Sequence, residues 1–369
     1  MADVLGLPYF LVTYALLQSV VFLLLIRFLD LYEREPLGVL ALMAAWGATG
    51  AVALSLVGNE LVMGLLPQRV VEALGPAIAA PIVEETAKGL ALVAAFFLSW
   101  LVARRFGFLE LEGVTDGIVY GAAVGLGFAF TEDFLYLLNT ADESGMGAGL
   151  SEYATRVDFF GVGQLGHAVY AGAFGAGLGL ATWSRSWKGR LGFPVLGLAT
   201  GMLMHAVHNG LAPFVMVVRY GLDNTASALS GGILPARLFE QMRATAESAT
   251  AVAAVTDYVF VSLFLAAVAL WLRYQRGVIR DELAEETETG LLSREELELM
   301  PRYWRRSKEY LRLLWEGKLE RWRQLSRVHN ELVDLAFFKW RLKRNGGDQS
   351  HVDKRRRRIA ALRSLAALE

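Results

Sequence analysis

The stretch PIVEETAKGL, residues Pro81 to Leu90, places Glu84, Glu85 and Lys88 inside a long apolar segment. Ionisable side chains are costly in hydrocarbon, and those found in membrane-spanning helices usually face other helices and mark a functional site. On a helix, Glu84 and Lys88 lie one turn apart, so a neutralising ion pair is a sufficient explanation of these two residues alone. The rest of the chain has to decide between a structural and a functional explanation.

The composition is that of a membrane protein. The chain has 369 residues, of which 54% are hydrophobic, and a formal net charge of -1. Few soluble domains of this size are so apolar. Charged residues are sparse up to Trp271 and dense from Arg273 onward. The chain has no cysteine, which excludes disulfides and thiolate metal sites.

Seven segments are apolar and long enough to cross a bilayer, since about 20 helical residues span a hydrocarbon core of roughly 30 Å. The sequence therefore predicts an all-α polytopic membrane protein with about seven transmembrane helices. We predict a transmembrane domain over 1–276 and a charged helical cytoplasmic tail over 277–369. The predicted segments are 6–28, 37–66, 75–102, 114–138, 159–183, 191–218 and 251–272.

The basic residues of the short loops predict the orientation. Arg and Lys are more frequent after the first, third, fifth and seventh segments, as at Arg104, Arg105 and Lys188, than in the alternate loops. Cytoplasmic loops carry such an excess. We therefore expect a multi-pass protein of the cell membrane, with its N-terminus outside and its tail in the cytoplasm.

Small residues recur at intervals of four in the fourth, fifth and sixth segments. Residues four apart share a helix face, and small ones let two backbones approach closely. These three helices are therefore predicted to form a tight bundle. The residues are Gly117, Gly121 and Gly125, then Ala171, Gly175 and Gly179, then Gly197 and Gly201.

Polar side chains gather in the same part of the chain. Glu84, Glu132 and His167 lie at a similar depth, roughly 12–15 Å below the outer helix ends at 1.5 Å per residue, and His205 lies nearer mid-span. Both histidines continue the small-residue rows that are predicted to pack inward. One such residue is often explained by an interhelical hydrogen bond, but several at one level on four helices indicate a functional site. The other polar candidates are Glu85, Lys88, Asp133, His208, Asn209 and Asp116, the last of which fits a helix cap near the membrane boundary.

Two hydrolytic routes fit these residue types. Two histidines and a carboxylate suit a Zn²⁺ ion that keeps an open position for water, with a second carboxylate as general base. A desolvated glutamate and a histidine can instead activate water without a metal. Asn209, one turn after His205, can donate to an oxyanion in either case. A proton or ion pathway uses the same residue types, so the residues alone leave this alternative open.

The motifs in these segments resemble the PrsW family of intramembrane proteases, within the wider glutamate-type group that includes the CAAX prenyl endopeptidases and the Abi (CPBP) proteins. The resemblance covers roughly residues 30–220 and depends on four motifs that occur in the expected order. They are APIVEETAKG, DGIVYGAAVGLGFAFTED, HAVYAG and HAVHNG.

The resemblance implies proteolysis of a membrane-embedded protein substrate. In PrsW-like proteins this is typically a single-pass anti-sigma factor that is cut near its extracytoplasmic side in stress signalling. Carried over by motif, Glu84 and Glu85 become the water-activating pair and Asn209 the oxyanion donor. Glu132 becomes a catalytic residue or metal ligand, and the histidines ligands or catalytic partners. The supporting residues implied are Lys88, Asp116, Asp133 and His208.

The chain departs from the family pattern at two of these positions. Asp133 stands where the pattern usually has Asn, and His208 stands where an aromatic residue is common. Two alternatives to a protease stay open beside it. One is a transporter coupled to protons or ions, and the other is a protease-like fold that acts as a non-catalytic binding or immunity protein.

The tail is predicted to be helical. SREE, from Ser293 to Glu296, is a capping box that opens a helix. The basic run Lys354–Arg358 is expected either to contact anionic lipid or a cytoplasmic partner, or simply to be solvated. On a membrane-tethered chain it does not predict nucleic-acid binding. His329 and His351 are expected at the surface.

Overall fold

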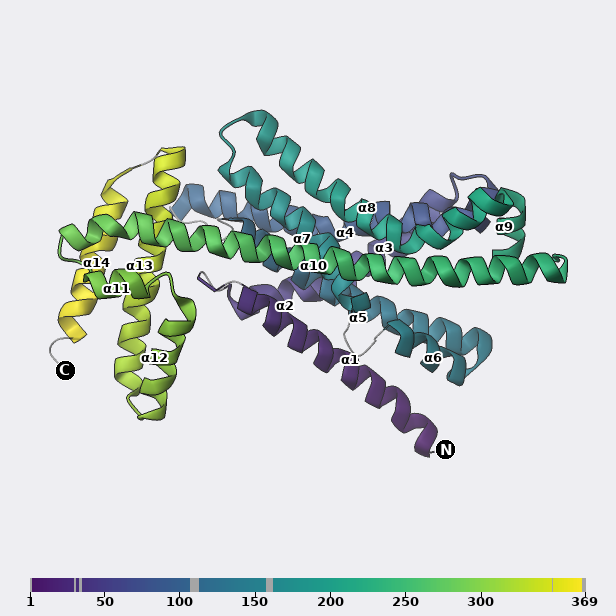
Figure 1. The fold of residues 1–369 in the computed structure, drawn as a ribbon, viewed down its shortest axis with the longest axis horizontal. Helices are drawn as coiled ribbons and strands as arrows, with labels where there is room; N and C mark the ends of the chain where they lie inside the picture. Colours follow the sequence, from purple (N-terminus) through teal and green to yellow (C-terminus); the bar gives the residue numbers. More distant parts are fainter. Residues whose placement is uncertain are drawn as a thin grey trace. The chain divides into compact units, whose positions relative to one another are not determined.

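A computed structural model describes residues 2–29, 31–32, 35–106, 113–156, 162–346 and 348–366. These residues are almost entirely helical, and no strand occurs among them (Figure 1). The all-α prediction is therefore confirmed. The first three residues of the predicted segment 159–183 lie outside the described residues. The chain divides into two compact units, which we describe separately: Met1–Leu29 with Glu35–Leu265, and Asp30–Arg34 with Ala266–Glu369.

The first unit holds the predicted apolar segments, apart from the end of the seventh. A π-helical turn, η1, joins α2 and α3, so that the chain is continuously helical from Leu37 to Met63. The helices are α1 (Ala2–Leu29), α2 (Leu37–Trp46), η1 (Gly47–Ala51), α3 (Val52–Met63), α4 (Gln68–Phe106), α5 (Val114–Ser144), α6 (Met146–Arg156), α7 (Val162–Trp183), α8 (Trp187–Tyr220), α9 (Leu222–Leu229) and the first part of α10 (Ala236–Glu288).

Four helical stretches of the described residues are long and apolar enough to cross a membrane. They are Leu37–Met63, Val114–Ser144, Trp187–Tyr220 and Ala236–Glu288. A shorter apolar stretch, Thr13–Phe28, lies in α1. The helices α4 and α7, which contain two further predicted segments, are not among the four.

Helix α5 is the buried centre of the first unit, and glycine is required where α7 crosses it. A Cβ atom on Gly125 would lie 2.2 Å from the carbonyl oxygen of His167, and one on Gly121 would lie 2.3 Å from that of Ala171. Both distances are far below van der Waals contact. On α8, a Cβ atom on Gly201 would lie 2.5 Å from the carbonyl oxygen of Tyr170. The predicted tight packing of these three helices is thus confirmed.

Hydrogen bonds at the end of α2 and in the π-helical turn connect this part of the chain to α4 and α5. The indole N–H of Trp46 donates to the carbonyl oxygen of Ala87 on α4, at 3.1 Å. The hydroxyl of Thr131 on α5 donates to the carbonyl oxygen of Ala48 in the turn, at 2.9 Å. Single π-helical turns inside α-helices are frequent at functional sites. Here the turn places α3 next to the polar residues of α4 and α5.

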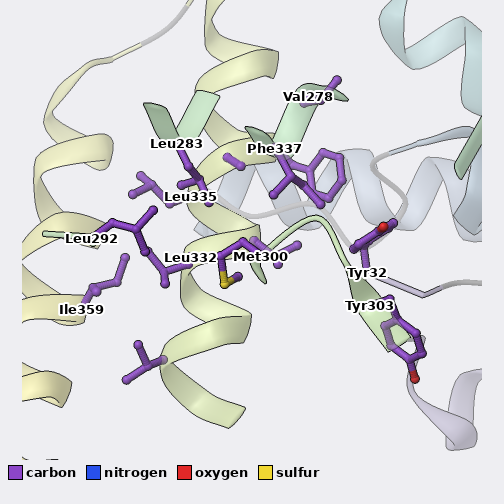
Figure 2. Close-up of a cluster of buried hydrophobic side chains, with 14 of the residues drawn as sticks. Tyr32, Val278, Leu283, Leu292, Met300, Tyr303, Leu332, Leu335, Phe337 and Ile359 are labelled. Carbon is purple, nitrogen blue, oxygen red and sulfur yellow. The ribbon is translucent and has the colours of Figure 1, made fainter. Parts of the chain in front are cut away.

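The second unit has its own apolar core, formed where the end of α10 packs against the tail helices (Figure 2). Leu283, Leu332 and Leu335 are fully buried in it. The capping box at Ser293 is present, with the Glu296 N–H donating to Ser293 Oγ at 3.1 Å. The tail helices are α11 (Arg294–Leu299), α12 (Tyr303–Trp315), α13 (Leu319–Asn345) and α14 (Ser350–Ala366).

The prediction that His329 lies at the surface is wrong. Its side chain is buried, with 1% of the residue exposed, and Nδ1 lies 2.7 Å from the Tyr310 hydroxyl. The cause is its position on α13, where Leu332 and Val333, three and four residues later on the same face, are also fully buried. His351 is exposed, as predicted.

The basic run of α14 binds acidic residues of its own unit. Arg356 donates to both carboxylate oxygens of the fully buried Glu286, at 2.8 and 2.9 Å. Arg358 lies 2.9 Å from Glu331. These ion pairs join α14 to α10 and α13, so part of the run serves to hold the tail helices together.

Candidate active site

Three ionisable residues in the middle of α4 face the interior of the first unit. Glu84, Glu85 and Lys88 have 4%, 2% and 0% of their surface exposed. The Lys88 ammonium group donates to Glu85 Oε1 at 2.8 Å and lies 3.6 Å from Glu84 Oε2. It also lies 3.8 Å from the ring centroid of Phe128. One buried cation therefore offsets two carboxylates on the same helix face and is further stabilised by an aromatic ring.

His167 of α7 lies between Lys88 and Glu132 of α5. Lys88 Nζ is 2.8 Å from His167 Nδ1, and His167 Nε2 is 2.8 Å from Glu132 Oε2. An ammonium group can only donate a hydrogen bond, so Nδ1 accepts and the proton of the neutral ring is on Nε2, which donates to Glu132. The tautomer of His167 therefore follows from its two neighbours.

His205 of α8 has the opposite tautomer. Its Nδ1 lies 2.9 Å from Glu85 Oε1, and a carboxylate accepts, so Nδ1 carries the proton. Nε2 then accepts from the Asn209 amide at 3.1 Å, and it lies 3.9 Å from Glu84 Oε2. The Asn209 amide has a second N–H, which remains for another acceptor.

Glu84, His167 and His205 together form a potential metal site. One ligand atom from each lies within 4.8 Å of the other two, and all three residues are buried. Two histidines and a carboxylate are the donor set of a known class of catalytic zinc site. Glu84 Oε2 is buried and has no hydrogen-bond partner among the described residues. A buried carboxylate oxygen in that state fits a cation ligand, so the residues present fit the ion that the sequence suggested.

This grouping differs in one respect from the ligand set that the sequence suggested. The sequence grouped Glu132 with the two histidines as ligands. In the structure, Glu84 shares the cluster with them, while Glu132 accepts from His167 Nε2. Glu132 also lies 3.4 Å from Arg156 of α6, through the same oxygen, Oε2.

Arg156 and Asp133 extend the polar network toward α6. The Arg156 guanidinium group donates to Asp133 Oδ1 at 2.9 Å and lies 3.8 Å from the ring centroid of Tyr136. Asp133 therefore lies next to Glu132 in the sequence but contacts α6 instead of the histidines. Sequence reasoning treated Arg156 only as a loop charge, although an Arg that follows several acids close to a membrane segment is a signal for such a contact.

His208 forms a second, smaller cluster with two residues that the sequence reasoning missed. Its Nδ1 lies 2.6 Å from Asp257 Oδ2 on α10, and the Tyr170 hydroxyl donates to Asp257 Oδ1 at 3.1 Å. The Tyr170 ring stacks on His205, with centroids 5.3 Å apart and planes at 19°. Asp257 is the only acidic residue in the predicted segment 251–272, which is a signal that was available.

Asp116 lies at the start of α5, where its Oδ2 accepts a hydrogen bond from the Gly113 N–H at 2.9 Å. This agrees with its interpretation as a helix cap.

Of the residues that the sequence singled out, the structure thus joins seven in one network: Glu84, Glu85, Lys88, Glu132, His167, His205 and Asn209. Asp116, Asp133 and His208 lie outside that core.

Comparison with known proteins gives one match. A family model described as PrsW family intramembrane metalloprotease matches residues 35–229, which is more than half of the chain. The matched region contains every residue of the network above. No curated protein matches the chain, and no solved structure does.

Proposed function

Because the chain belongs to the PrsW family of intramembrane metalloproteases, we propose that it hydrolyses a peptide bond of a membrane-embedded protein substrate. The observation that carries this proposal is the buried network of Glu84, Glu85, His167 and His205. Their polar atoms lie 2.8–3.9 Å from a neighbour in the network, on three different helices. A structural ion pair between Glu84 and Lys88 explains neither histidine.

We assign Glu84, His167 and His205 as the ligands of a Zn²⁺ ion. Bound there, the ion supplies a Lewis acid for water and for the scissile carbonyl. Glu85 prepares His205 for this role, because it accepts the Nδ1 proton and so leaves the Nε2 lone pair for a ligand. The lone pair of His167 is on Nδ1, which accepts from Lys88, so ligation through Nδ1 would replace that contact and keep the hydrogen bond from Nε2 to Glu132.

The second carboxylate of the mechanism is Glu132. It lines the same cavity as Glu84, and Glu85 is not part of that lining. We propose that Glu132 takes a proton from the attacking water and passes it to the leaving amine. The free N–H of Asn209 then donates to the oxyanion of the tetrahedral intermediate. Glu85 and Lys88 hold the histidines in place and balance the buried charge.

The membrane arrangement is part of the proposal. We assign seven spans, which are α1, the continuous helix α2–η1–α3, α4, α5, α7, α8 and α10, with the N-terminus outside. The transmembrane domain then covers 1–276 and the charged helical tail, 277–369, is cytoplasmic. The basic residues of the loops support this orientation. It puts the active site in the outer half of the membrane, which suits a single-pass, anti-sigma-factor-like substrate cut near its extracytoplasmic side.

The experiment is cleavage in liposomes, with purified protein and a panel of single-pass substrates, read by mass spectrometry of the fragments. We expect wild type to cleave a substrate, and Glu84→Gln and His205→Ala to lose at least a hundredfold in rate. Glu60→Gln, an exposed glutamate on α3, is the matched control and is expected to keep full activity. Proton flux without cleavage would instead favour a transporter. An unchanged phenotype of Glu84→Gln in cells would favour a binding protein.

A further inference from the structure

A cavity of about 350 Å³ lies beside the proposed catalytic residues. It is bounded by α3 and α5, with Glu84 of α4 in its wall. Leu56 and Tyr136 are 58% and 43% exposed, so the cavity reaches the side of the helix bundle between α3 and α5. The lining residues are Val52, Ser55, Leu56, Asn59, Glu84, Phe128, Glu132, Leu135, Tyr136 and Asn139.

Three residues that line this cavity each have a buried side-chain oxygen with no hydrogen-bond partner among the described residues. The oxygens are Ser55 Oγ, Asn59 Oδ1 and Glu84 Oε2. Only 3% of Ser55 and 4% of Glu84 are exposed. Glu84 Oε2 forms an ion pair with Lys88 at 3.6 Å, so the two oxygens left without a partner among the described residues are Ser55 Oγ and Asn59 Oδ1. Buried polar groups in native proteins are nearly always hydrogen-bonded, so these two indicate that a ligand supplies their partners.

Ser55 is unusual for its position in a helix. Hydroxyl groups inside helices commonly donate to the carbonyl oxygen four residues earlier. Thr49 does so to Ala45 at 2.7 Å, and Thr86 does so to Ile82 at 2.6 Å. Ser55 Oγ makes no such bond, although Ser55 is one of the residues that line the cavity.

The chemistry of the lining matches an unwound peptide. A peptide group offers one N–H donor and one C=O acceptor. Asn59 Oδ1 can accept the first, and the Ser55 hydroxyl can donate to the second. The apolar side chains of Val52, Leu56 and Leu135 suit an uncharged side chain of the substrate. The two glutamates disfavour an acidic one, because like charges repel at close range.

An intact helix in this cavity would leave Ser55 and Asn59 without partners. A helix with its side chains is about 10–12 Å in diameter, and its peptide groups are bonded to one another. A locally extended segment fits, but its N–H and C=O groups then need new partners in a place without free water. Ser55 and Asn59 are placed to supply them.

We propose that the cavity between α3 and α5 is the substrate-binding site, in which Ser55 and Asn59 hydrogen-bond the backbone of an unwound transmembrane segment beside Glu84 and Glu132. This inference rests on the proposed function, since it names how the substrate of that same site is held. Entry occurs laterally, between α3 and α5, past Leu56 and Tyr136.

Binding is tested first, because it does not depend on turnover. The chain has no cysteine, so Ser55→Cys introduces a single thiol, and its alkylation by a small maleimide is followed in detergent. The probe is a synthetic transmembrane peptide of about 25 residues with a central Gly-Gly pair, compared with the same peptide carrying Leu-Leu. We expect the Gly-Gly peptide to slow alkylation at least fivefold and the Leu-Leu peptide to slow it much less. Ser248→Cys, at an exposed position of α10, is the control and stays unprotected.

Kinetics provide the second test. Ser55→Ala is expected to raise KM about fivefold, which corresponds to about 1 kcal/mol, while kcat stays within twofold. Thr49→Ala, which removes a hydroxyl from the neighbouring turn outside the cavity, is expected to leave KM unchanged. Cleavage by wild type with unchanged KM in Ser55→Ala and no protection of Ser55→Cys would overturn the binding site alone. Absence of cleavage with protection intact would overturn the proposed function and support the binding site.

Discussion

The Nζ atom of Lys88 lies 2.8 Å from Nδ1 of His167, so a buried ammonium group on α4 binds a histidine on α7 directly. The same ammonium group donates to Glu85, which in turn binds His205 on α8. Lys88 is fully buried, and its charge is also offset by Glu84, whose Oε2 lies 3.6 Å from Nζ. It therefore holds three helices of the site in register.

Replacing Lys88 tests this role. Lys88→Met leaves Glu84 and Glu85 buried without their counter-charge, and loss of one partner of a buried ion pair costs about 3–5 kcal/mol. We expect a lower midpoint in thermal unfolding in detergent, together with loss of cleavage. The double variant Lys88→Met/Glu85→Gln is expected to recover part of the stability, because it also removes one unpaired charge. A Lys88→Met protein as stable as wild type would contradict the role of Lys88.

The close approach of α5 and α7 gives a prediction that does not depend on chemistry. Gly125→Ala puts a methyl group 2.2 Å from the carbonyl oxygen of His167, so the helices have to separate. Overpacking of this kind costs about 1–3 kcal/mol, and it displaces His167. The control is Gly38→Ala on α2, where no atom lies within 4 Å of the new methyl group. We expect thermal unfolding to show a loss of stability for Gly125→Ala and none for Gly38→Ala.

Asp257 connects α10 to the site through Tyr170, which stacks on His205. We expect Asp257→Ala to lower kcat about tenfold by freeing the Tyr170 ring, with the metal content unchanged. Tyr170→Phe is expected to have a similar effect. Since the two residues act through one hydrogen bond, the double variant should be no worse than the more impaired single one. Asp281→Asn, an exposed aspartate on the same helix, serves as the control. Fully additive losses would show that Asp257 acts by another route.

The tail is expected to lose stability in acid because of His329. Burial, together with the positive charge of Arg306, lowers the pKa of His329 to about 4. The unfolded chain takes up a proton near pH 6.5 and the folded chain does so only near pH 4, so stability falls between these values as the pH drops. The full loss from this residue is about 3 kcal/mol. Unfolding of the full chain, followed from pH 8 to pH 4, checks it. His351→Gln, at an exposed position, should leave the profile unchanged, whereas His329→Gln should flatten it.

The sequence was sufficient to predict which helices bring the polar residues together. Two features of the sequence predict that these side chains converge. One is the similar depth of Glu84, Glu132 and His167, and the other is the row of small residues on the helix face of each histidine. In the structure the side chains lie close together. The prediction was possible because buried charges need partners and glycine rows need a close neighbour, which leaves few ways to pack these helices in a membrane. The partner of each atom could not be predicted, since that depends on rotamers and on helix rotation.

Three features of the structure could not be predicted from a pattern in the sequence. Glu84 shares the cluster with both histidines, while Glu132 lies on the far side of His167. This arrangement depends on the rotation of α4 and α5 about their axes. Asp257 comes from α10, outside the region that resembles the family, and its contact with Tyr170 joins residues far apart in the chain. The surface position predicted for His329 is wrong, because the tail helices pack into a core of their own. The face that it shares with Leu332 proved decisive.

The most direct test of the central claim is the metal content of the purified protein, measured by mass spectrometry beside its cleavage activity. Wild type is compared with Glu84→Gln, His167→Ala and His205→Ala, and with Glu60→Gln as the control. The proposal predicts about one Zn²⁺ per chain in wild type and in the control, and loss of both metal and cleavage in the three ligand variants. A metal-free wild-type protein that still cleaves its substrate would contradict the zinc assignment and leave water activation to the glutamates.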